Sequence, residues 1–142
     1  MTFDEFASIY PKNESRAFIE AAYAIWLLEK GASVTAQNIR LAAASKMRLA
    51  DTADTVYTIT VDEYINMFRK NIKSKSYHSR RIKQEFRMML EQQEWMELPN
   101  ECKQVKWFDS VVITEGSAVI KYKLSVTIFD YLKLYMYSIY GR

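Results

Sequence analysis

The first third of the chain has its hydrophobic residues at helical spacing. Thr2 and Glu5 are placed as a capping box, which predicts a short helix over residues 2–10. Residues 14–30 predict a longer helix that ends near Gly31. Two neighbouring apolar sets cover most of this helix, so it either lies at the centre of the core or forms a homodimer with a second copy of the chain. The two sets are Phe18, Ala21, Ala22, Ile25 and Leu28, and Ile19, Tyr23 and Trp26.

The middle of the chain alternates between the helical period and the strand period. We expect a helix over residues 35–49, a strand over residues 55–61 and a longer helix over residues 76–93. Thr60 and Glu63 have capping-box spacing, which predicts that the strand passes directly into a further helix. The inward positions are Ile39, Ala42, Ala43 and Met47 in the first helix, Tyr57, Ile59 and Val61 in the strand, and Ile82, Phe86, Met89 and Leu90 in the long helix.

The last third changes to the period of two that is typical of strands. Residues 105–113 and 119–128 predict two strands, residues 114–117 predict the turn between them, and residues 129–142 predict a short helix. From residue 35 on, the order is helix, strand, helix, helix, strand, strand. This order predicts an α+β winged helix, with N-terminal helices, a helix-turn-helix, a β-hairpin wing and a short C-terminal helix.

The composition supports one folded domain. The chain has 142 residues, 49% of them hydrophobic, with three Gly and two Pro, which is enough apolar surface for one core and little sequence typical of linkers. We expect a single winged-helix-like domain over residues 1–142, with residues 1–33 as an N-terminal helical extension. A single cysteine, Cys102, and the lack of a signal-peptide pattern or a membrane-spanning apolar stretch predict a cytoplasmic protein.

Positive charge is concentrated in residues 69–87. This segment has four Arg and four Lys against one Glu, a net charge of +7 in a chain whose net charge is +3. In the predicted winged helix it forms the turn and the start of the second helix of the helix-turn-helix, the element that enters the DNA major groove in such folds. Cations at a helix N-terminus oppose the macrodipole by about 0.3–1 kcal/mol each, and a bound phosphate would remove that cost.

We therefore expect this segment to bind DNA through the phosphate backbone and the major groove. Lysines on the polar side of the predicted hairpin would add contacts from the wing, although lysines also protect a solvated strand edge. A solvated basic face, or an acidic protein partner, would fit the same pattern. The candidate DNA-binding residues are Arg69, Lys70, Lys73, Lys75, Ser76, Tyr77, His78, Ser79, Arg80, Arg81, Lys83, Arg87, Lys121 and Lys123.

The residue types that carry catalysis or hold metals are sparse in this sequence. His78 is the single histidine and lies among cations. It therefore fits a hydrogen-bond donor to phosphate, or a surface residue, better than a general base. Cys102 has no histidine near it, and the sequence contains no nucleotide-binding glycine loop, hydrolase motif or paired cysteines. We expect no enzymatic activity, no cofactor and no metal. Four glutamates have the spacing of a solvated helix face, namely Glu91, Glu94, Glu97 and Glu101.

Four segments together resemble the first winged-helix domain of plasmid replication initiators of the Rep type. They are VTAQNIRLAAASKM, VYTITVDEYINMF, SRRIKQEFRMML and KYKLSVTIFDYL, and they cover residues 34–132 in the order of that family. The resemblance implies a domain that dimerises and touches the DNA backbone, while a second winged helix reads the origin repeats. It also implies that the chain is a fragment or a single-domain relative.

The N-terminal segment FDEFASIYPK also resembles an F-x-x-F-x-x-x-Y-P-K segment of phage replication and primosome-loading proteins. Both resemblances point to the replication of mobile DNA. We interpret the chain as a non-catalytic DNA-binding protein of a phage or plasmid that acts in replication initiation or its control. Two other functions fit the same residues: a phage structural or assembly protein that docks an acidic partner, and a transcription regulator.

Overall fold

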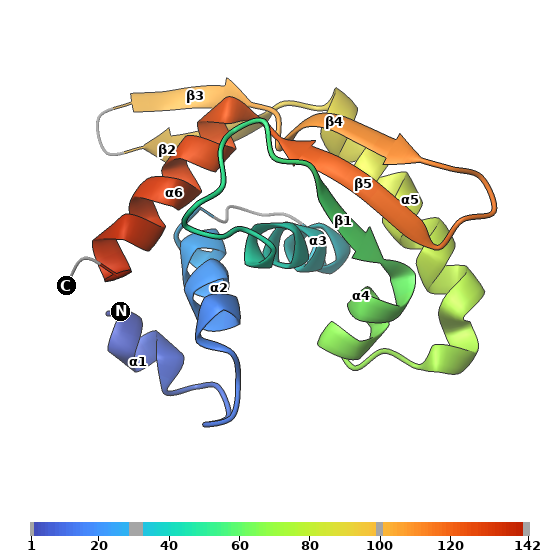
Figure 1. The fold of residues 1–142 in the computed structure, drawn as a ribbon, viewed down its shortest axis with the longest axis horizontal. Helices are drawn as coiled ribbons and strands as arrows, with labels where there is room; N and C mark the ends of the chain where they lie inside the picture. Colours follow the sequence, from blue (N-terminus) through green and yellow to red (C-terminus); the bar gives the residue numbers. More distant parts are fainter. Residues whose placement is uncertain (1, 29–32, 99–100, 141–142) are drawn as a thin grey trace.

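The computed structural model describes residues 2–28, 33–98 and 101–140. Figure 1 shows a small sheet with helices beneath it, a separate hairpin, and α5 at the end of the molecule away from both termini. The elements are α1 (Phe3–Ala7), α2 (Arg16–Leu28), α3 (Val34–Ser45), β1 (Tyr57–Thr60), α4 (Val61–Met67), the 3-10 helix η1 (Ile72–Ser74), α5 (Lys75–Glu91), β2 (Glu94–Leu98), β3 (Glu101–Val105), β4 (Phe108–Ile113), β5 (Val119–Leu124) and α6 (Val126–Tyr140).

The core lies between the three-stranded sheet and the helices α3 and α5. The strands are antiparallel in the order β1-β5-β4, and the register pairs Ile59 with Ile120. Side chains alternate along β5, so Ile120, Tyr122 and Leu124 are buried on the face toward these helices. The Tyr122 hydroxyl donates a hydrogen bond to the Ala43 carbonyl of α3 at 2.9 Å. The inward positions predicted for the helix of residues 35–49 are all buried, namely Ile39, Ala42, Ala43 and Met47.

The winged-helix order predicted from the sequence is confirmed. From α3 on, the chain passes through β1, α4, η1 and α5, then through the added strands β2 and β3, and then through β4 and β5. The Thr60–Glu63 capping box forms at the start of α4, where the Glu63 N–H donates to the Thr60 hydroxyl at 3.0 Å and the Thr60 N–H donates to the Glu63 carboxylate at 3.1 Å. The capping box of Thr2 and Glu5 forms in the same way at α1.

Three sequence predictions between the long helix and the C-terminus are wrong. The long helix ends at Glu91, and residues 94–105 form a hairpin of β2 and β3 that the sequence analysis did not predict. Glu94, Glu97 and Glu101 therefore belong to strands and not to a solvated helix face. The final helix begins earlier than predicted, since α6 starts at Val126, where the sequence analysis still expected a strand.

These three errors have two physical causes, one at the hairpin and one at the start of α6. The strands β2 and β3 pair with each other, and the apolar Trp95 is exposed together with Glu101 and Cys102, so hydrophobicity along these strands does not follow burial. At the start of α6, the buried residues Leu124, Ile128 and Leu132 are four apart and fit a helix as well as a strand.

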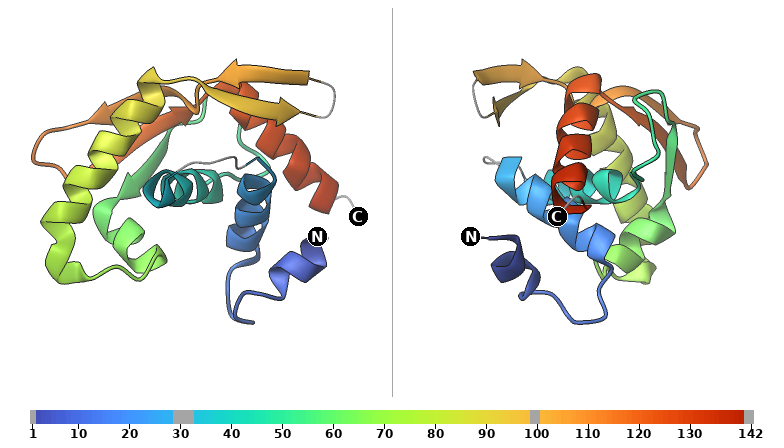
Figure 2. Two further views of the ribbon diagram at one scale, coloured as in Figure 1. Left: turned by 180° about the vertical axis from the view of Figure 1, so that it is seen from behind. Right: turned by 60° about the vertical axis from the view of Figure 1, so that its left-hand side comes forward.

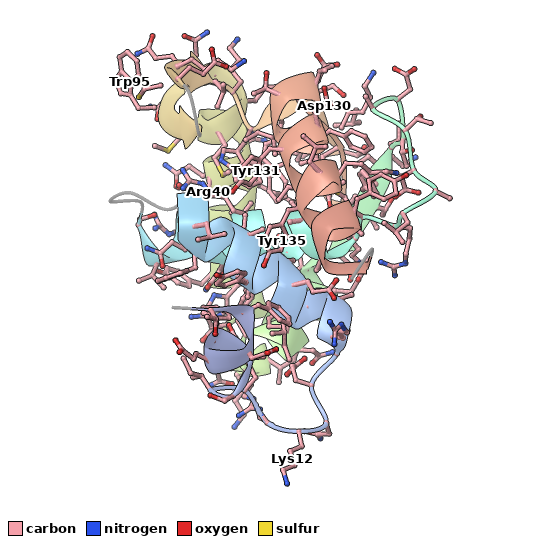
Figure 3. All side chains as sticks on the ribbon, turned by 90° about the vertical axis from the view of Figure 1, so that its left-hand side faces the viewer. Lys12, Arg40, Trp95, Asp130, Tyr131 and Tyr135 are labelled. Atoms are coloured by element: carbon pink, nitrogen blue, oxygen red, sulfur yellow. The ribbon has the colours of Figure 1, made fainter. Side chains whose placement is uncertain are left out.

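The chain itself covers most of α2. Ala21, Ala24 and Ile25 belong to the main core, and α2 packs against α3, α1 and α6. The ring of Tyr23 lies 5.2 Å from Phe6 of α1 and 5.6 Å from Tyr135 of α6, between centroids. Figure 3 views this end of the molecule, with Tyr135 on α6 and Lys12 in the loop before α2. The central position in the core therefore accounts for the two apolar sets.

Dimerisation through residues 14–30 stays a prediction. Trp26 and Leu27 are the exposed large hydrophobic residues of α2, at 45% and 41% exposure. Gly31, which was expected to follow this helix, lies outside the described residues. Among the described helices, none is long and apolar enough to cross a membrane.

Candidate nucleic-acid interface

One side of α5 holds the helix on the core. Ile82, Phe86 and Met89 are buried. The Phe86 ring stacks on Phe108 of β4 at 5.0 Å between centroids and lies 5.8 Å from the ring of Tyr122 of β5. An α-helix with 3.6 residues per turn places these three residues on one side, so the opposite side faces solvent. Figure 2 shows this helix along one end of the molecule, with the β4–β5 turn projecting at the same end.

The outward side of α5 carries cations that have no carboxylate partner among the described residues. Arg80, Arg81 and Arg87 are exposed, and Lys83 is half-buried. None of the four forms an ion pair within the part of the chain that the structure describes. The hydrophobic contacts of α5 thus bring these predicted site residues together on one solvent-facing surface.

The turn between α4 and α5 adds three further cations. The Lys70 N–H donates to the Ile65 carbonyl at 2.9 Å and the Arg69 N–H donates to the Asn66 carbonyl at 3.4 Å, which closes the end of α4 in a Schellman motif. Arg69 occupies the left-handed position of this motif, with φ 53°, where glycine is usual. We call the unpaired cations of the turn and of α5 the basic face: Arg69, Lys70, Lys73, Arg80, Arg81, Lys83 and Arg87.

The first turn of α5 is open to an anion. Ser74, the N-cap residue, makes no side-chain capping hydrogen bond. Ser76 and Tyr77 are exposed, while His78 and Ser79 are half-buried. The Lys75 N–H donates to the Ile72 carbonyl of η1, so the positive end of the macrodipole is what favours an anion at this point. Lys75 adds less positive charge to this turn than the sequence implied, because its Nζ pairs with Asp62 of α4 at 2.9 Å.

The lysines of the wing lie apart from the basic face. Lys121 and Lys123 alternate with the buried residues of β5, so they point to the sheet face opposite α5. Lys121 is exposed, and Lys123 pairs with the carboxylates of Asp54 at 3.6 Å and Asp109 at 3.5 Å. These ion pairs make Lys123 a weaker candidate for a DNA contact, and the wing contacts stay a prediction.

Comparison with known protein families identifies the family to which this domain belongs. The family model described as the WH1 domain of initiator replication proteins matches residues 13–138. The chain belongs to this family. As a WH1 domain of a replication initiator, it is a DNA-binding winged helix that acts in replication initiation. The resemblance to Rep-type initiators is therefore confirmed, whereas the resemblance of the N-terminal segment to phage primosome proteins stays a prediction.

A solved structure is also similar to this WH1 domain. It is the WH1 domain of MSBI1.176, a replication protein isolated from a multiple sclerosis patient. The two share 14% sequence identity over 94% of this chain and 93% of that chain, with a TM-score of 0.45. No curated protein matches the chain significantly.

Gln84 is a residue of the WH1 domain's outward surface that the sequence analysis did not select. It is exposed on α5 between Arg80 and Arg87. The charge count that located residues 69–87 overlooks an uncharged side chain. The helical period alone would have found it, because Tyr77, Arg80, Gln84 and Arg87 follow one another at intervals of three or four residues.

Proposed function

We propose that this WH1 domain binds duplex DNA with the basic face, and that phosphate contacts supply most of the affinity. The observation that carries the proposal is the set of cations on the basic face, which lack a carboxylate partner within the described structure. Positive charges held close together repel one another, and a polyanion relieves that repulsion. The proposed role is binding, without catalysis.

The fold gives the proposed complex its orientation. In a helix-turn-helix the second helix lies in the major groove, with its N-terminal residues toward the base edges. In this domain that helix is α5, and its uncapped first turn and the α4–α5 turn lie at the same end of it. Phosphates beside the groove would then meet Arg69, Lys70 and Lys73 in the turn, and Arg81 and Arg87 along the helix.

The salt dependence of binding tests this proposal. We expect the affinity for a duplex to fall with a log–log slope of about −0.9 for each phosphate neutralised. Replacing both Arg81 and Arg87 by Ala should weaken binding and make the slope less steep by about 2, since two phosphate contacts are lost. Fluorescence anisotropy of a labelled duplex at several salt concentrations measures both quantities.

A charge-matched double variant is the control. Lys12 is exposed before α2 and Lys103 lies on β3, so replacing both by Ala removes the same charge from outside the basic face. The control should keep the wild-type slope. Equal slopes in the wild type and the Arg81/Arg87 variant would show that the DNA contacts lie elsewhere.

Self-association through residues 14–30 is proposed on a smaller surface than the sequence implied. Trp26 and Leu27 remain exposed on α2, and they would form its centre. Sedimentation velocity should show a dimer that Leu27→Arg weakens, because a charge would then be buried at the contact. A wild-type domain that stays monomeric at all accessible concentrations would contradict this part of the proposal.

A further inference from the structure

We propose that α5 also reads base sequence, and that Gln84 is the residue that recognises adenine. This inference rests on the proposed function, because it requires α5 to lie in the major groove. Gln84 is exposed, and its side chain forms no hydrogen bond within the described residues. Both ends of its amide are therefore available to a ligand.

The position of Gln84 on the helix favours a base contact over a phosphate contact. Each residue of an α-helix turns by about 100°, so Gln84 lies about 160° from each of the buried residues Ile82 and Phe86, two positions away on either side. It therefore occupies the crest of the outward side. Arg81 and Arg87 each lie about 60° from the crest, on opposite flanks. In a groove, the crest points toward the base edges and the flanks face the two backbones.

The chemistry of the crest differs from that of its flanks. A glutamine amide has one acceptor oxygen and two donor hydrogens, and it matches the N6 and N7 atoms of adenine in a bidentate pair. A phosphate has no donor to offer the amide oxygen, so a glutamine at the crest serves adenine better than it serves the backbone. Tyr77 and Met88 are exposed near the same crest and can contact a thymine methyl group.

The spacing of the neighbouring arginine extends the inference to a short motif. Arg80 precedes Gln84 by four residues, which is about 6 Å along the helix axis. That rise corresponds to about two base-pair steps of 3.4 Å. Arginine pairs in a bidentate manner with guanine. The geometry therefore predicts a preferred sequence in which a guanine and an adenine lie about two steps apart.

Selection of duplexes from a randomised pool tests the inference. The wild-type domain should enrich a motif with one strongly preferred adenine. Gln84→Ala should lose discrimination at that base by about five- to a hundredfold, and Gln84→Glu should shift it toward cytosine, whose N4 donates to a carboxylate. Affinity for a duplex of random sequence should stay within about twofold for Gln84→Ala, because the phosphate contacts remain. Gln104→Ala, on the exposed part of β3, is the control and should leave the motif unchanged.

The outcomes separate this inference from the proposed function. If the wild type enriches no motif, or if Gln84→Ala keeps the wild-type motif, base reading by Gln84 is overturned. The proposed function survives either result as long as binding stays salt-dependent and sensitive to the Arg81/Arg87 variant. A domain that binds no duplex at low salt overturns both.

Discussion

Arg69 shows how a single backbone position can combine strain with function. Its φ of 53° lies in the left-handed region, which costs a non-glycine residue about 1 kcal/mol or more. The Schellman motif at the end of α4 requires that conformation, and glycine would adopt it without the penalty. An arginine at this point is therefore unfavourable for folding, and its side chain supplies one of the cations of the basic face.

Arg69→Gly should change stability and DNA affinity in opposite directions. We expect the free energy of unfolding to rise by up to about 1 kcal/mol, because the strain is relieved. The affinity for DNA should fall and the salt slope should become less steep by about 1, because one phosphate contact is lost. Urea denaturation and anisotropy titrations measure the two effects. A variant that loses stability, or keeps the full affinity, would contradict this account of Arg69.

At the scale of single elements, the link between α3 and α4 depends on Glu63. Its carboxylate caps α4 through the Thr60 N–H and forms an ion pair with Lys46, which follows α3. Burial raises the pKa of Glu63, but the hydrogen bonds from Lys46 and Thr60 outweigh burial and hold the pKa below its ordinary value. A pKa lowered by folding means that the ionised carboxylate stabilises the fold above the ordinary pKa, and that this contribution is lost as the pH falls through the folded pKa.

Glu63→Gln should therefore destabilise the domain in a pH-dependent manner. Gln keeps an oxygen for the capping box but loses the charge that Lys46 meets, so the cost at neutral pH should be about 0.2–1 kcal/mol. The difference from the wild type should shrink as the pH falls below the ordinary pKa of glutamate. Glu5→Gln changes the same group in the capping box of α1, where no lysine is paired with it in the described structure. Thermal unfolding across acidic pH compares the two variants, and a Glu63 effect that persists unchanged at low pH would exclude the ion pair as its cause.

The elements that the sequence predicted well have local signals. The capping boxes at Thr2 and Thr60 act within four residues of the chain, and the apolar faces of α3 and α5 follow the helical period. The hairpin of β2 and β3 lacks such a signal, since its strands pair with each other and expose Trp95 and Cys102. The start of α6 was misplaced because Leu124, Ile128 and Leu132 suit both periods.

The sequence indicated where the candidate site lies, but it did not indicate which of the candidate cations form ion pairs within the chain. Residues 69–87 stood out because their net charge of +7 exceeds the +3 of the whole chain, and the order of elements placed them on the helix-turn-helix. The pairing of Lys75 with Asp62 and of Lys123 with Asp54 depends on tertiary contacts, which no local pattern reveals. We therefore propose the basic face, and not the whole predicted set, as the main DNA-binding surface.

At the scale of the whole molecule, the two ends have different surfaces. Figure 1 shows α5 and the wing at one end, and α1 and the end of α6 at the other. Outside residues 69–87 the chain is net acidic, so a polyanion is attracted to one end and repelled from the rest. The aromatic contacts of Phe6, Tyr23 and Tyr135 lie at the end away from α5, so we expect that DNA bound at the basic face would not cover them.

The measurement that tests the central claim most directly is a titration of the isotope-labelled domain with a short duplex, followed by NMR at each backbone amide. The account predicts that the largest chemical-shift changes occur in residues 69–87, while the amides of α1 and α6 stay unchanged. Shift changes that gather on α1, α2 and α6, with residues 69–87 unaffected, would contradict DNA binding at the basic face.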